Sequence, residues 1–265
     1  MSSSSGTRSV DAAVRLAPSL REKVWGRKRL APWFPDSPVP IGEVWYLAER
    51  HLPLLVKLIF TSERLSVQVH PDDGEDGPHG KTEMWHILEA DPGATIALGF
   101  REPVTRERLR EAAQTGEIEQ LLKWVPVKPG ETYFTPAHTV HAIGAGIVLC
   151  EIQQNSDVTY RLWDYGRPRE LHLEQGLAVA DLGVHPGAVD GVVRSKHFVT
   201  EQVGLVAGEA RTPEARNCQL WICIGGSGTI GGEPYGQGEV WLLPEGQQPE
   251  IRSGAGARFL RTWTP

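Results

Sequence analysis

The chain has 265 residues, which is enough for one large β domain or two smaller ones with a substantial buried core. Its formal net charge of −6 and pI near 5.9 argue against a nucleic-acid or anionic-membrane binder, because both need a basic face. The three cysteines form no CxxC pair, and the N-terminal segment lacks the apolar stretch of a signal peptide. We therefore expect a cytoplasmic protein, in which any anionic substrate is bound by local cations.

Short β-branched and aromatic runs separated by Gly and Pro predict an all-β fold. We expect residues 1–19 to be a disordered tail and residues 20–50 to carry the first strands. The segments "LPLLVKLIF" and "LSVQVHP" are predicted to be adjacent strands joined by a hairpin turn at "TSER".

One helical insertion is predicted near residues 104–124. Its apolar residues Ile118, Leu121, Leu122 and Val125 recur at helical spacing before Pro126 ends the pattern. The segment "LHLEQGLAVADL" is predicted to be a connecting helix. Short strands resume after residue 192 and indicate a second, smaller β unit, in which we interpret the glycine-rich "GSGTIG" as a hairpin turn because no helix follows it.

Polar side chains alternate with apolar ones in two of the predicted strands. Gln68 and His70 share one face of the first strand, and Lys81 and Glu83 share one face of the next. Same-face neighbours lie about 6.6–6.8 Å apart along a strand, so the tips of such side chains can reach one ion.

A third element, "TPAHTVHAIG", offers His138 and His141. Either histidine could complete a Gln/His/Glu/His set, whose nitrogen and oxygen donors suit zinc, iron or manganese.

Four separated motifs, "SVQVHPDD", "GKTEMW", "PAHTVHAIG" and "EIQQNSDVTYRLWDYGR", together resemble the type I mannose-6-phosphate isomerases, in particular their short bacterial form within the cupin superfamily. The resemblance covers roughly residues 20–180 and continues in order to the C-terminus. It implies two cupin-type jelly rolls, a bicupin-like arrangement. Residues 20–185 would be the metal-bearing catalytic domain, and residues 192–265 a metal-free domain.

The resemblance also implies the residues of the site. The metal ligands would be Gln68, His70, Glu83 and His141, and the catalytic residues Arg161 and Lys81. Two positions depart from the family pattern. His138 stands where the family usually has Gly, and Gly80 stands where longer members have His.

The implied activity is the interconversion of mannose 6-phosphate and fructose 6-phosphate by proton transfer between C2 and C1 through a cis-enediol. One divalent metal per chain, expected to be zinc, would stabilise the oxygen on which negative charge develops. Lys81 with a lowered pKa ranks first as the base, with His86 and a metal-bound water as alternatives. Arg161 could serve either the phosphate or the enediolate.

Two alternatives remain open at this point. His70, Glu83 and His141 alone would suit the iron site of a cupin dioxygenase, and the chain could also be a non-catalytic sugar-phosphate sensor. Gln68 as a fourth ligand and Arg161 as a phosphate ligand favour the isomerase. The sequence leaves the oligomeric state and the pathway undetermined.

Overall fold

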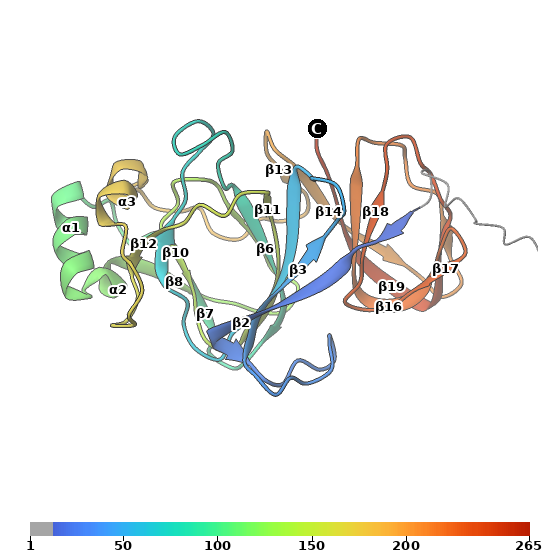
Figure 1. Cartoon of the computed structure of the whole chain (residues 1–265), viewed down its shortest axis with the longest axis horizontal. Coiled ribbons are helices and arrows are strands. Elements are labelled where there is room, and N and C mark those ends of the chain that lie inside the picture. Colours follow the sequence, from blue (N-terminus) through green and yellow to red (C-terminus); the bar gives the residue numbers. More distant parts are fainter. Residues whose placement is uncertain (1–12) are drawn as a thin grey trace, which may run out of the picture. The chain divides into compact units, whose positions relative to one another are not determined.

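A computed structural model describes residues 13–265, which form two compact units. The larger unit is Pro18–Asp190, and the smaller unit is Gly191–Pro265 together with the described residues before Pro18. Strands dominate both units, which confirms the predicted all-β class (Figure 1). The boundary after Asp190 lies between the predicted domain ends at 185 and 192.

The larger unit contains a six-stranded sheet in the order β2–β3–β4–β11–β6–β9. Neighbouring strands from β3 to β9 are antiparallel. Strands β4 and β11 are buried along their whole length, as expected for central strands covered on both faces. The strand bounds are β2 Ala17–Arg27, β3 Ile41–Leu47, β4 Leu54–Phe60, β6 Glu83–Ala90, β9 Thr132–Thr135 and β11 Ile147–Gln154.

A five-stranded antiparallel sheet in the order β12–β5–β10–β7–β8 faces the six-stranded one. Alternate residues of its strands belong to different buried clusters: Ile96 and Leu98 pack with residues of the six-stranded sheet, while Ala97 packs on the other side. The strand bounds are β5 Val67–Val69, β7 Thr95–Phe100, β8 Leu122–Pro126, β10 His141–Ile143 and β12 Tyr160–Trp163.

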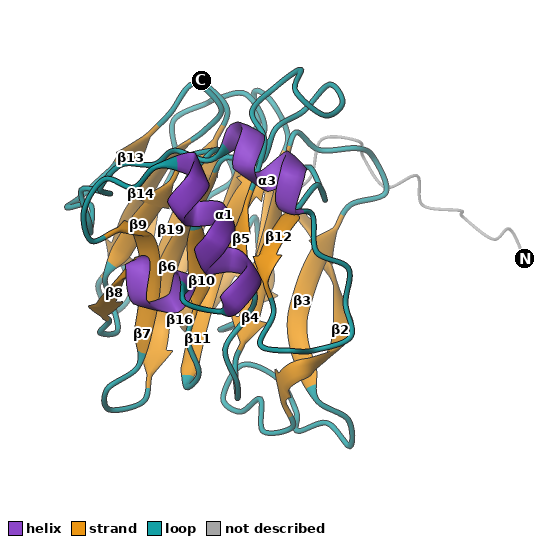
Figure 2. Ribbon diagram, turned by 90° about the vertical axis from the view of Figure 1, so that its left-hand side faces the viewer, coloured by secondary structure: helices purple, strands orange, loops and turns teal. Residues whose placement is uncertain are grey.

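Three helices cover the outer face of the five-stranded sheet (Figure 2). They are α1 Arg106–Thr115, α2 Ile118–Leu121 and α3 Leu173–Val179, and the last confirms the predicted connecting helix. Helix α1 begins after Thr105, whose side chain accepts a hydrogen bond from the backbone N–H of Arg108, and ends at Gly116 with a left-handed φ of 85°. Since this sheet is buried on both faces, polar residues on its inner face need a specific partner there.

The predicted hairpin at "TSER" is wrong. Strand β4 belongs to the six-stranded sheet and β5 to the five-stranded one, so this segment carries the chain from one sheet to the other, with Ser62, Glu63 and Arg64 exposed. The Thr61 hydroxyl stabilises the crossing, because it donates to the carbonyl of Gly144 at 2.8 Å and accepts from the backbone N–H of Ile147 at 2.9 Å. Strands β4 and β5 are close in sequence, but they pair with other strands in two different sheets and not with each other.

The helical insertion is shorter than predicted. Helix α2 ends at Leu121, and residues 122–126 form β8, where Val125 pairs with Ile96 and Trp124 pairs with Ala97 of β7. Apolar spacing over 118–125 fits a helix, but Trp and Val also favour strands, and pairing with β7 satisfies the backbone groups. Tertiary pairing therefore decided the conformation.

The smaller unit contains one sheet in the order β1–β18–β16–β19–β14–β13, with β15 paired to β19 and β17 paired to β16. The four residues predicted to be its packing residues, Trp221, Ile224, Val240 and Leu242, are all buried. The strand bounds are β1 Val14–Arg15, β13 Val193–Arg194, β14 Val199–Leu205, β15 Ala210–Arg211, β16 Gln219–Ile230, β17 Glu233–Tyr235, β18 Val240–Leu243 and β19 Ile251–Trp263.

The predicted disordered tail, residues 1–19, extends too far toward the C-terminus. Residues 1–12 lie outside the described residues, but Val14–Arg15 and the start of β2 are already in strands. No helix among residues 13–265 is long and apolar enough to cross a membrane.

Residues 226–230 of "GSGTIG" form the end of strand β16, and only Gly231 lies in the hairpin turn that follows, so the interpretation as a turn holds only for the last residue; no helix follows the segment. Gly228 lies within β16, and a Cβ there would overlap the backbone carbonyl of Arg252 in the neighbouring strand.

We expect Gly228→Ala to lower the free energy of unfolding by about 1–3 kcal/mol, because the strands would have to separate to admit the methyl group. Gly204→Ala is the matched control, since Gly204 lies in β14 of the same unit with no atom near the position of its added Cβ. Urea denaturation of both variants measures the difference. Equal midpoints would contradict the close-approach explanation.

Candidate metal centre and cavity

Three buried ionisable side chains converge between the two sheets of the larger unit. His70 follows β5 and His141 begins β10 of the five-stranded sheet, whereas Glu83 begins β6 of the six-stranded sheet. One ligand atom of each lies within 4.8 Å of the others. The Glu83 carboxylate is 3.7 Å from Nε2 of His70 and 3.4 Å from Nε2 of His141.

The hydrogen bonds of the two imidazoles direct both Nε2 lone pairs to the same point. Nδ1 of His70 lies 2.9 Å from the carbonyl oxygen of Val158, and Nδ1 of His141 lies 2.8 Å from that of Thr139. A carbonyl only accepts, so each Nδ1 donates its proton and each Nε2 is free to bind a cation.

Both Nε2 atoms and both carboxylate oxygens of Glu83 are buried without a hydrogen-bond partner. Buried polar atoms rarely lack a partner, and here four of them face one another. Two imidazole nitrogens and a carboxylate are ligands of zinc, iron and manganese in proteins. The residues present therefore fit a divalent metal ion.

Burial controls the protonation of this trio. It raises the pKa of Glu83 to about 8, an effect that the charge of Glu151 increases and that of Lys81 opposes. Burial lowers the pKa of His141 to about 4, and burial together with the charge of Lys81 lowers that of His70 well below its usual value. Both imidazoles are therefore neutral at neutral pH, which is the form that binds metals.

A row of paired residues crosses three strands beside the trio. His141 of β10 pairs with Gln68 of β5, and Gln68 pairs with Arg161 of β12. Val67 and Val69 pack beneath the helices on the opposite face of β5, so Gln68 faces the interior. The structure thus brings the predicted site residues together on the inner face.

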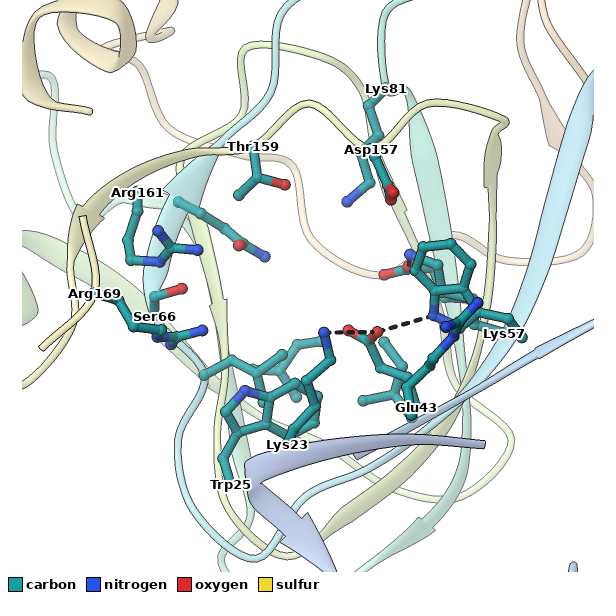
Figure 3. A pocket seen from close by; sticks show the side chains of 17 residues that line it. Lys23, Trp25, Glu43, Lys57, Ser66, Lys81, Asp157, Thr159, Arg161 and Arg169 are labelled. Carbon is teal, nitrogen blue, oxygen red and sulfur yellow. Dashed lines mark hydrogen bonds and ion pairs between the residues drawn. The ribbon is translucent and has the colours of Figure 1, made fainter. Parts of the chain in front are cut away.

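A cavity of 490 Å³ lies between the sheets and is lined by Gln68 among other residues. Figure 3 shows side chains from several strands converging on it. Its charged lining comprises six cations and three carboxylates, although the whole chain is acidic. These residues are Arg21, Lys23, Lys57, Lys81, Arg161, Arg169, Glu43, Glu151 and Asp157.

A buried ion pair forms part of the wall. Lys57 Nζ lies 3.0 Å from the carboxylate of Glu151 and 2.5 Å from the side-chain oxygen of Gln153, and the indole of Trp85 donates to Glu151 at 3.1 Å. Burial opposes both charges, but the charge of Glu151 raises the pKa of Lys57, and that of Lys57 lowers the pKa of Glu151. Both groups are therefore charged at neutral pH.

Sequence reasoning missed Lys57 and Glu151. Each is the one charged residue within a strand that is otherwise apolar or amide-bearing, "LLVKLIF" and "IVLCEIQQ". A lone charge in a fully buried strand was the available signal, because such a charge needs a partner in the interior.

Lys81 and Arg161, the two predicted catalytic residues, both line the cavity. Lys81 Nζ lies 3.6 Å from the carboxylate of Glu83. Arg161 donates to the backbone carbonyl of Glu170 at 2.7 Å, and its buried Nε has no partner. Burial and the neighbouring charge of Arg169 lower the pKa of Arg161.

Two further histidines considered in the sequence analysis, His138 and His86, lie outside the trio. The side chain of His138 is 35% exposed, with Nε2 2.7 Å from the carboxylate of Glu75. His86, an alternative base in the sequence analysis, points to the opposite face of β6, where Nδ1 lies 2.9 Å from the hydroxyl of Thr132. His86 therefore lies on the face of β6 opposite Glu83 and does not line the cavity.

No protein-family model matches the chain. Individual proteins do match it. The chain is 36% identical over 239 residues to a mannose-6-phosphate isomerase of Streptococcus mutans, covering 78% of this chain and 75% of that protein. It is 33% identical over 291 residues to a mannose-6-phosphate isomerase of Bacillus subtilis, covering 86% and 92% of the two chains.

Solved structures agree with these relatives. The crystal structure of mannose 6-phosphate isomerase from Bacillus subtilis superimposes with a TM-score of 0.85 at 26% identity, over 95% of this chain and 99% of that one. A putative mannosephosphate isomerase from Archaeoglobus fulgidus shares the fold, with a TM-score of 0.80 at 18% identity over 95% and 97% of the chains. On its fold, its interior site and these similarities, the chain belongs to the mannose-6-phosphate isomerase family.

Proposed function

We propose that this chain interconverts mannose 6-phosphate and fructose 6-phosphate in the interior cavity, with one divalent metal held by Gln68, His70, Glu83 and His141. The proposal rests on family membership and on one observation in particular. Four buried, unpartnered ligand atoms lie next to a cavity whose lining carries an excess of cations. An anionic substrate that reacts beside a metal ion requires this combination.

Gln68 is proposed as the fourth ligand because it pairs directly with His141 and lines the cavity. We infer zinc as the metal, since mixed nitrogen and oxygen ligands in a closed interior suit it well. A divalent ion bound there would supply Lewis-acid stabilisation of the negative charge that develops on the substrate oxygen during enolisation.

Lys81 is the proposed group that moves the proton between C1 and C2. It lines the cavity and lies 3.6 Å from Glu83, so a substrate beside the trio would be within its reach. The Lys81 amine is proposed to take the proton from C2 and return it to C1, while a second proton passes from O2 to O1 to complete the exchange. We prefer Lys81 to His86 for this role because Lys81 lines the cavity and His86 does not.

Arg161 is proposed to bind negative charge on the substrate, either on the phosphate or on the enediolate. Its guanidinium has no carboxylate partner among the described residues, since its only acceptor there is a backbone carbonyl. It can therefore pair with substrate charge without first breaking an ion pair.

The smaller unit is proposed to bind no metal, and a cytoplasmic location is also proposed. No histidine follows His197 in the sequence, and the glutamates after it are scattered over turns and strand ends. The location rests on cysteine usage: Cys150, Cys218 and Cys223 are all free, and Cys150 and Cys223 are buried.

Turnover of mannose 6-phosphate, measured with the metal content of the same preparation, tests the proposed function. Isomerase activity with one equivalent of metal per chain is the expected result. Iron with oxygen-dependent activity would instead indicate a dioxygenase, and binding of mannose 6-phosphate without turnover would indicate a sensor.

We expect Glu83→Ala and His141→Ala each to lose both the metal and the turnover, because removing a ligand leaves the ion under-coordinated. Elemental analysis after dialysis, together with the isomerase assay, measures both effects. His138→Asn is the control: Asn tolerates the left-handed φ of 73° at this position, and metal content should stay at one equivalent per chain. Full metal occupancy in either alanine variant would contradict the ligand assignment.

We expect Arg161→Ala to lower kcat/KM roughly 10²–10³-fold while the metal content and circular dichroism stay unchanged, because the guanidinium acts on charge in the bound complex. Arg108→Ala, on the exposed surface of α1, is the matched control and should keep wild-type kinetics. Wild-type kcat/KM in the Arg161 variant would remove Arg161 from the site.

A further inference from the structure

A second guanidinium lies at the Arg161 end of the cavity. Arg169, which sequence reasoning did not single out, lines the cavity together with Arg161 and Ser66, and Figure 3 shows the three side chains on one side of it. The proximity of Arg169 contributes to the lowered pKa of Arg161, after burial. Two like charges held together in a partly buried wall are unfavourable unless an anion lies between or beside them.

Asp164 holds Arg169 in a fixed orientation. Its side chain is 1% exposed, and it accepts from Nε of Arg169 at 2.6 Å and from Nη2 at 2.7 Å, a two-pronged pairing. The remaining terminal nitrogen of Arg169, Nη1, has no hydrogen-bond partner among the described residues. The guanidinium is therefore oriented in advance and still has donors to offer.

The local charge is unbalanced. Asp164 also accepts from Nη1 of Arg167 at 3.2 Å, so this one carboxylate is shared by two arginines while Arg161 has none. Arg167 has a further partner in Glu63, at 3.0 Å. The positive charge that is left at this end of the cavity matches a phosphate dianion.

The position along the row of strands also fits a phosphate. His141 and Arg161 are two strands apart, with β5 between them, so their backbones are separated by roughly 10 Å. In a hexose 6-phosphate the reacting carbons, C1 and C2, and the phosphate on C6 lie at opposite ends. With the reacting end beside the metal trio, the phosphate comes to the arginine end.

We propose that Arg169, oriented by Asp164, binds the phosphate group of the substrate and makes the cavity selective for phosphorylated sugars. This inference rests on the proposed function for the identity of the sugar, but not for the phosphate site itself. It also distinguishes Arg169 from Arg167, which contacts the same carboxylate but does not line the cavity.

The test compares Arg169→Gln with Arg167→Gln in the metal-loaded full chain. Two quantities are measured: kcat and KM for mannose 6-phosphate, and the Kd of inorganic phosphate by calorimetry. We expect Arg169→Gln to raise KM and the phosphate Kd at least about tenfold, the loss typical for a hydrogen bond to a charged group, with kcat nearly unchanged. Arg167→Gln should leave both constants close to wild type. Arg169→Lys, which retains the charge, should bind phosphate more tightly than Arg169→Gln.

Unchanged KM and phosphate Kd in Arg169→Gln would overturn the proposal. Equal losses in Arg167→Gln would also overturn it, because the effect would then come from the shared carboxylate and not from a contact with phosphate. If the wild type binds phosphate through Arg169 but does not turn over mannose 6-phosphate, the phosphate site stands and the proposed isomerase activity fails.

Discussion

The carboxylate of Glu83 sets the constraint on which the interior of the larger unit depends. It is fully buried, and neither of its oxygens has a hydrogen-bond partner. Such a group is expensive to bury unless positive charge compensates it. Lys81 lies 3.6 Å away and two neutral imidazoles aim their lone pairs at the same point, so a bound cation, and not a further protein donor, would complete the compensation. The two sheets therefore enclose a site built for an ion.

The charges around this carboxylate are separated into those already paired and those left for a ligand. Lys57 and Glu151 neutralise each other within the wall, and Asp164 engages Arg169 without using all of its donors. Arg161 has only a backbone carbonyl. An acidic protein can thus present a cationic cavity to a sugar phosphate, because its acidic residues lie mostly elsewhere and two of the three cavity carboxylates, Glu43 and Glu151, are paired with lysines.

Alternation within single strands predicted which residues share a face, as the opposite placement of Gln68 and Val67 illustrates, and the motif resemblance predicted the family. Pairing between strands distant in sequence could not be obtained in that way. The strand pairing that brings Lys57 to Glu151 joins two residues that are 94 positions apart in the sequence. The same limitation made "TSER" look like a hairpin and residues 122–124 look helical, since short apolar runs fit several local structures until a neighbouring strand selects one. Arg169 was missed for a related reason: its place in the cavity depends on a loop anchored by Asp164.

With the proposed ligand set, the three-residue strand β5 would make metal uptake a reporter of correct assembly. Its central residue, Gln68, pairs with His141 on one side and Arg161 on the other, while Glu83 comes from the opposite sheet. Because side chains alternate, a slip of one residue in β5 would turn a valine inward and move Gln68 to the helix-covered face. A chain with this slip would no longer place the Gln68 amide on the inner face, aligned with the His141 imidazole and the Arg161 guanidinium. If the site holds the proposed ion, its retention would discriminate native molecules from compact misfolded ones, independently of any assay of turnover.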